Sequence, residues 1–186
     1  MAFEKAEIRS RTAEVRSRST VTIVHKANVL KLTDGLFREQ CLKVATEFPQ
    51  VAVKEMLVDA MAMRLVRDPE SFDVIVTTNL FGDILSDEAS ALIGGLGVAP
   101  SANVGERVAV FEPVHGSAPD IAGQGIANPI GAILSAAMLL EHLGQGGAAA
   151  RVRQAVNVAL ADGVLPRDLG GAAGTRDVTR AVVRNL

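Results

Sequence analysis

Two aspartates four residues apart are the most distinctive candidates for chemistry in this 186-residue sequence. Asp83 and Asp87 follow an apolar stretch at 72–77 and fall within 80–93, whose pattern predicts a helix. Residues at this spacing share one helix face, with Cβ atoms about 5–6 Å apart. Their charges repel each other, and a hard cation such as Mg²⁺ or Mn²⁺ would offset that repulsion. The alternative is that both acids only stabilise the N-terminal helix dipole.

Asp59 and Lys26 each follow a predicted strand. Asp59 stands where a strand at 51–58 gives way to a short helix, a position at which α/β folds place functional side chains. It could equally cap that helix. Lys26 follows the β-branched run 20–24 and could be an acid–base group, an anion-binding group or a solvated surface charge.

The segment 94–129 is rich in glycine and proline and predicts a long functional loop with one short strand at 108–111. Within it, Gly116 would let the backbone approach a ligand, and Pro119 fixes φ. Asp120 could accept a hydrogen bond from a ribose hydroxyl, as acids do in NAD sites. An ordinary glycine/proline loop is the alternative.

Several other motifs are absent. Gly123-Gln-Gly125 begins like a dinucleotide fingerprint, but Asn128 stands where the third glycine belongs, and no strand precedes it. There is no Walker loop, no G-x-S-x-G elbow and no H-E-x-x-H motif. Three scattered histidines and one cysteine do not make a zinc site.

The elements that must position these residues alternate between strands and helices. Strands are predicted at 20–24, 51–58, 72–77 and 108–111, and helices at 35–48, 59–66, 80–93, 129–143, 148–160 and 175–186. Thr33 and Asp34 could cap the first of these helices, and Asn79 the third. The sequence becomes rich in glycine and proline after residue 93, which predicts two domains, 1–93 and 94–186. The second has too few predicted strands for a sheet of its own.

Composition excludes several classes of function. A net charge of −2 and the absence of Trp and Tyr argue against nucleic-acid binding, and there is no polybasic membrane patch or 18-residue apolar run. Residues 2–18 alternate acids and bases, which predicts a solvated helix face rather than a signal or transit peptide. The single cysteine, Cys41, fits a reducing compartment, so the cytoplasm is expected.

Five segments together resemble one family. They are 25–29 (HKANV), 58–63 (VDAMAM), 78–87 (TNLFGDILSD), 111–123 (FEPVHGSAPDIAG) and 127–129 (ANP). In this order, they resemble the C-terminal half of the isocitrate/isopropylmalate/homoisocitrate dehydrogenases, which decarboxylate 2-hydroxy acids. The resemblance runs from about residue 20 to the end and implies the C-terminal half of that family's α/β/α sandwich.

The resemblance also implies roles for individual residues. Asp83 and Asp87 of one subunit would bind Mg²⁺ or Mn²⁺, while Asp59 would complete the site from the other subunit, together with Lys26 as proton-transfer residue. The adenosine side of the cofactor would be lined by His115, Gly116, Ser117, Ala118, Pro119, Asp120, Ile121, Asn128 and Asp168. The nicotinamide end would be approached by Asn28, Val29, Asn79 and Glu112.

The same resemblance favours a particular cofactor, substrate and assembly. Asp120 would repel a 2′-phosphate, so NAD is expected rather than NADP. His25 and the segment 32–37 resemble the homoisocitrate and NAD-isocitrate branches, whereas 59–63 leans towards isopropylmalate. A homodimer is expected, with the helices at 59–66 and 80–93 at its interface.

One departure from the family concerns length. Family members are roughly twice as long, and the additional N-terminal part supplies the first strands of the large sheet, the substrate-binding arginines and a tyrosine that works with the lysine. The chain is therefore expected to be a truncation or one piece of a split gene. The runner-up interpretation is a non-catalytic remnant or regulatory subunit that keeps the dimer surface and the cofactor loop.

Overall fold

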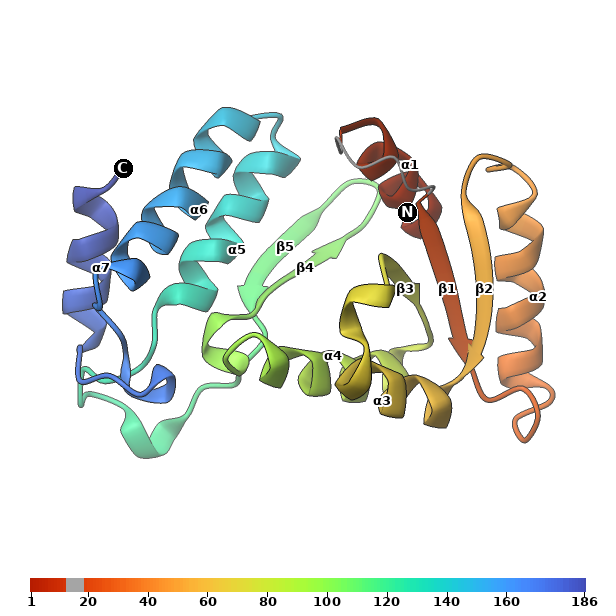
Figure 1. Cartoon of the computed structure of the whole chain (residues 1–186), viewed down its shortest axis with the longest axis horizontal. Helices are drawn as coiled ribbons and strands as arrows, with labels where there is room; N and C mark the ends of the chain where they lie inside the picture. The colour runs from red at the N-terminus through yellow and green to blue at the C-terminus, as the bar shows by residue number, and fades with distance from the viewer. Residues whose placement is uncertain (13–18) are drawn as a thin grey trace. The chain divides into compact units, whose positions relative to one another are not determined.

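The computed structural model describes residues 1–12 and 19–186, which form two compact units, 1–89 and 90–186 (Figure 1). The first helix, α1, spans Ala2–Thr12. The remainder of the predicted helical segment, 13–18, lies outside the described residues. Within the described ranges, no helix is both long and apolar enough to cross a membrane.

A parallel three-stranded sheet organises the first unit. Its strands are β1 (Thr20–His25), β2 (Ala52–Leu57) and β3 (Val74–Val76), in the order β2-β1-β3. Val21 pairs with Val53 on one side and with Val74 on the other, so β1 is the central strand. Its β-branched residues are buried on both faces, as a covered parallel strand requires.

Helices cover both faces of this sheet and make three layers. The helices after β1 are α2 (Thr33–Ala45), α3 (Val58–Arg67) and α4 (Asn79–Leu92). On one face, α1 and α2 pack against Val21 and Ile23. On the other face, Met61 of α3 and Leu85 of α4 pack with Val24. The α/β/α layering and the parallel sheet confirm the predicted fold class.

The second unit combines a hairpin with three helices. The elements are β4 (Pro100–Val104), β5 (Ala109–Pro113), α5 (Ile130–His142), α6 (Gly146–Ala161) and α7 (Thr175–Arg184). The two strands are antiparallel. Ile130, Val156 and Val178 bring one residue from each helix into a common core.

Three local expectations need correction. The segment 94–129 holds two strands rather than one, because β4 begins with a proline and carries small and polar residues that mask its strand pattern. The third strand covers only Val74–Val76 of the predicted 72–77. Thr33 and Asp34 do not cap α2 but lie within its first turn, where the Asp34 carboxylate accepts a hydrogen bond from the Lys26 amide.

Candidate active site

Lys26 and Asp59 meet at the carboxyl edge of the parallel sheet. Lys26 directly follows β1, and Asp59 is the second residue of α3, which follows β2 without a loop. His25 and Leu57 are register partners, so both strands end at the same level. Lys26 Nζ lies 2.5 Å from Asp59 Oδ1, and this hydrogen bond is the main cause that lowers the pKa of Asp59. The sequence had indicated both residues but not their contact.

The ring of His25 lies beside Glu55 of β2. The residue is 6% exposed and lines a cavity of about 260 Å³ with Arg38 and Glu55. Arg38 donates two hydrogen bonds to Glu55, which is the principal cause lowering the pKa of Glu55. The ring of His25 therefore faces Glu55 beneath α2, so any effect of His25 on substrate choice would be indirect.

Asp83 and Asp87 lie one turn apart on α4, and both are exposed. Their carboxylates are the oxygen donors that Mg²⁺ and Mn²⁺ prefer. Among residues 1–12 and 19–186, however, no group of three His, Cys, Asp or Glu side chains converges within the chain. The two carboxylates suit a hard cation, and a third carboxylate ligand would have to come from outside the described residues of this chain.

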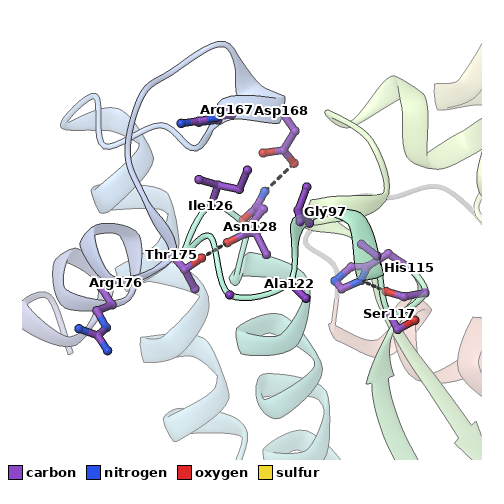
Figure 2. Close-up of a pocket in the computed structure, with 16 residues that line it drawn as sticks. Gly97, His115, Ser117, Ala122, Ile126, Asn128, Arg167, Asp168, Thr175 and Arg176 are labelled. Atoms are coloured by element: carbon purple, nitrogen blue, oxygen red, sulfur yellow. Dashed lines mark hydrogen bonds between the residues drawn. The ribbon is translucent and has the colours of Figure 1, made fainter.

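A pocket of about 870 Å³ lies in the second unit (Figure 2). It is lined by Gly97, His115, Gly116, Ser117, Ala118, Ile121, Ala122, Gly123, Gly125, Ile126, Ala127, Asn128, Arg167, Asp168, Thr175 and Arg176. Its volume is in the range of small-molecule sites, about 300–1,000 Å³. A lining of small apolar residues with a few amide, hydroxyl and carboxylate groups fits an adenosine moiety.

Hydrogen bonds hold the polar wall of this pocket in place (Figure 2). Asn128 donates to Asp168 Oδ2 over 2.9 Å, and its Oδ1 accepts from the Ile130 amide at the start of α5. Gly97 packs closely against this pair, because a Cβ there would lie 2.2 Å from Asp168 Oδ2. Ala118 adopts a left-handed φ of 43°, which is unusual for a residue other than glycine.

The structure assigns the predicted cofactor-binding residues to different places. Those that line the pocket are His115, Gly116, Ser117, Ala118, Ile121, Asn128 and Asp168. Pro119 and Asp120 belong to the short 3₁₀ turn Pro119–Ile121 and are exposed outside the lining. The others, also outside it, are Asn28 and Val29 in the turn after β1, Asn79 at the start of α4, and Glu112 on β5, which accepts a hydrogen bond from Asn103.

Sequence reasoning missed part of the lining. Gly123 and Gly125, set aside because they fail the dinucleotide fingerprint, both line the pocket with positive φ. Thr175, at the start of α7, donates to the Ala127 carbonyl and joins the pocket with its neighbour Arg176. No local signal links these residues, which lie about fifty positions apart along the chain.

The chain matches a known enzyme family over nearly its whole length. A family model described as isocitrate/isopropylmalate dehydrogenase matches residues 4–182, and the chain belongs to this family. The resemblance stated from the sequence is therefore confirmed.

Relatives with different substrates match closely. The chain is 61% identical over 176 residues to an isocitrate/homoisocitrate dehydrogenase of Thermus thermophilus, which covers 95% of this chain and 53% of the relative. It is 53% identical over 174 residues to a 3-isopropylmalate dehydrogenase of Methanothermobacter thermautotrophicus, covering 94% and 53%. The crystal structure of isocitrate dehydrogenase from Methylococcus capsulatus matches with a TM-score of 0.90 and 48% identity, over 99% of this chain and 53% of that one. The chain spans about half the length of these relatives.

Proposed function

We propose that this chain takes part in the NAD-dependent oxidative decarboxylation of a 2-hydroxy acid, with homoisocitrate or isocitrate as substrate. The contact between Lys26 and Asp59 carries the proposal, because it places an acid–base group beside a carboxylate at the carboxyl edge of the sheet. The likeness to the Thermus thermophilus isocitrate/homoisocitrate dehydrogenase supports the substrate class. Isopropylmalate is the alternative substrate, supported by relatives of similar identity.

Carboxylates on two helices would hold the metal ion. Asp83 and Asp87 supply one pair of oxygen donors, and Asp59 of a second copy of the chain would supply the third. When bound, Mg²⁺ or Mn²⁺ supplies Lewis-acid polarisation of the substrate's oxygens. The need for a second copy is consistent with the lack of a three-acid group within the described residues of one chain.

Lys26 would handle the proton. Oxidation removes a hydride and the hydroxyl proton from the 2-hydroxy acid, and loss of CO₂ leaves a carbon that must be protonated. Nζ of Lys26 is hydrogen-bonded to the Asp59 carboxylate, and the Lys26 side chain is a quarter exposed, so it could exchange a proton with a bound substrate. NAD would accept the hydride.

The pocket of the second unit would bind the adenosine end of NAD. Asn128 and Asp168 would present polar groups to the nucleoside, and His115 and Ile121 would contact its apolar surface. Arg167 and Arg176 add positive charge at the lining, which suits a phosphate-bearing ligand. The preference for NAD over NADP still rests on Asp120, which precedes Ile121 in the same turn.

The substrate assay follows NADH formation at 340 nm with homoisocitrate, isocitrate and isopropylmalate, each with NAD and Mg²⁺ or Mn²⁺. We expect one of the two tricarboxylates to be preferred and Lys26→Met to abolish turnover. A kcat/KM for isopropylmalate tenfold above both, about 1.4 kcal/mol of transition-state preference, would reverse the substrate assignment. Replacing NAD by NADP in the same assay tests the cofactor.

A non-catalytic role is the second candidate, because all residues that line the pocket belong to the second unit, whereas Lys26 and Asp59 belong to the first. Calorimetric titration with NADH separates the two. Binding without turnover of any of the three acids would favour a non-catalytic module that retains the cofactor pocket. Absence of NADH binding would contradict the dehydrogenase proposal. The single cysteine supports the cytoplasm as the expected compartment.

A further inference from the structure

Two buried side chains hold the backbone from which Lys26 extends. The Lys26 amide donates to Asp34 Oδ2 over 2.6 Å, and the next amide, of Ala27, donates to His25 Nδ1 over 3.2 Å. Asp34 is 3% exposed and His25 is 6% exposed. The Lys26 carbonyl in turn accepts from the amides of Val29 and Leu30. Both peptide groups of Lys26 are thus fixed by named partners.

The hydrogen bond that His25 Nδ1 accepts from the Ala27 amide also determines the tautomer of His25. A ring nitrogen that accepts from an amide carries no proton, so in the neutral ring Nε2 carries it. Nε2 lies 3.5 Å from Glu55 Oε2 and, within the described part of the chain, has no hydrogen-bond partner. The Nε2–H therefore points towards a carboxylate that Arg38 keeps in place, and this favours the orientation in which Nδ1 faces Ala27.

These contacts link Lys26 to α2, β2 and α3. Asp34 and Arg38 belong to α2, Glu55 belongs to β2, and β2 leads directly into α3, which carries Asp59. Lys26 Nζ in turn donates a hydrogen bond to Asp59 Oδ1. A side chain with four rotatable bonds reaches one geometry reliably only if its backbone is fixed.

We propose that Asp34 and His25 are positioning residues for Lys26: by accepting the amides of Lys26 and Ala27, they direct the lysine side chain to Asp59. The catalytic meaning of this inference rests on the proposed function, whereas the contact itself does not. Neither residue touches Asp59 through any hydrogen bond given above; each acts through the backbone of the turn. Removing either acceptor leaves a partly buried amide without its partner, and the turn is expected to shift to satisfy it.

The test observes the side-chain ammonium group of Lys26 by ¹H–¹⁵N spectroscopy of the whole chain. The chain has five lysines, and the signal that Lys26→Arg removes identifies the one required. Asp59→Asn provides the reference for a lysine without its carboxylate partner. In Asp34→Ala and His25→Leu, we expect the Lys26 ammonium to exchange its protons about tenfold faster and to move towards the reference signal.

Matched variants separate positioning from general damage. Asp34→Asn keeps an acceptor oxygen, and His25→Asn places an amide oxygen where the acceptor Nδ1 stood, so both should retain the wild-type signal. Thr22→Val alters another buried residue of β1, whose hydroxyl has no partner among the described residues, and should leave Lys26 unchanged. If Asp34→Ala does not fold, the His25→Leu and His25→Asn pair decides the question.

Two results would overturn the inference. One is a folded Asp34→Ala or His25→Leu chain whose Lys26 signal equals that of the wild type. The other is a wild-type signal already equal to that of Asp59→Asn. If NADH binding and turnover both fail while the Lys26 signal responds as expected, the proposed function is wrong and the positioning role stands.

Discussion

The hydrogen bonds from Arg38 favour the ionised form of Glu55, and they therefore affect the stability of the fold at acidic pH. The hydrogen bond from Arg38 is the main cause that lowers the pKa of Glu55 below its ordinary value of about 4.3. A lowered folded-state pKa stabilises the fold above the unfolded value, and this contribution disappears as the pH falls through the folded value. We expect Arg38→Met to raise the pKa of Glu55 towards its ordinary value and to flatten the acid side of the stability profile.

Carboxyl ¹³C titration of wild type and Arg38→Met measures this shift directly. Arg38→Lys serves as the control, because it keeps the charge but loses the two-pronged hydrogen bond. We expect an intermediate pKa in that variant. An unchanged Glu55 pKa in Arg38→Met would show that Arg38 does not control the charge of Glu55.

Arg176 offers a second prediction for a single residue. It lines the pocket beside Thr175, whereas Arg180, one turn further along α7, does not. If the pocket receives a phosphate-bearing nucleotide, Arg176→Glu should weaken the binding of ADP by about tenfold at low salt and by less at high salt. Arg180→Glu changes the net charge equally and should have little effect.

Calorimetric titration of both variants at two salt concentrations checks this expectation. Equal losses in the two variants would point to a long-range effect of net charge rather than to a contact in the pocket. Identical affinity in Arg176→Glu and the wild type would remove Arg176 from the proposed nucleotide site.

At the scale of elements, Gly97 joins the 3₁₀ turn Leu96–Val98 to the polar wall of the pocket. A Cβ at Gly97 would lie 2.2 Å from Asp168 Oδ2 and 3.0 Å from Asn128 Nδ2. Gly97→Ala should therefore separate Asn128 from Asp168 and lower NADH affinity about tenfold, the effect of losing one polar contact of about 1.4 kcal/mol. Fluorescence titration with NADH measures it, and unchanged affinity in a folded variant would contradict it.

Two further glycines should respond in opposite directions. A Cβ at Gly171 would lie 1.9 Å from the Leu165 carbonyl oxygen, so Gly171→Ala forces the backbone of this loop apart. We expect the free energy of unfolding to fall by about 3 kcal/mol. Gly147 lies in the first turn of α6 with open space around it, and Gly147→Ala should raise that free energy by about 0.5 kcal/mol. Urea unfolding measures both changes, and a tolerated Gly171→Ala would refute the crowding argument.

At the scale of the whole molecule, the incomplete metal site predicts self-association. Asp83 and Asp87 need a third carboxylate that one chain does not bring to them within its described residues. Exposed apolar side chains occur on the two helices that carry the candidate metal ligands, including Leu80 and Ile84 on α4 and Met63 on α3. We expect a dimer, and we expect Ile84→Lys to dissociate it.

Sedimentation velocity at micromolar concentration, with and without Mg²⁺, tests the assembly. Val183→Lys is the matched control, because Val183 is similarly exposed but lies on α7. A strict monomer in the wild type would contradict the shared site. A dimer that survives Ile84→Lys would place the interface elsewhere.

Local sequence patterns predicted most of the elements and several of the candidate residues. The β-branched run of β1 and the proline before the apolar run of α5 are properties of neighbouring residues, so they could be interpreted without a fold. Five ordered segments sufficed for the family, and Lys26 and Asp59 were singled out because each follows a strand. The strand β4 was not predicted, because its proline and small polar residues form only a weak strand pattern.

Which of these residues come into contact depends on how separate elements pack. The contact of Lys26 with Asp59 spans 33 positions, and that of Asn128 with Asp168 spans 40. The direction of His25 towards Glu55 depends on the register of β1 against β2 and on the packing of α2 above them. Local patterns record how a residue suits its immediate neighbours, whereas these contacts arise from the way separate elements pack together, and that packing is what brings distant side chains within hydrogen-bond distance.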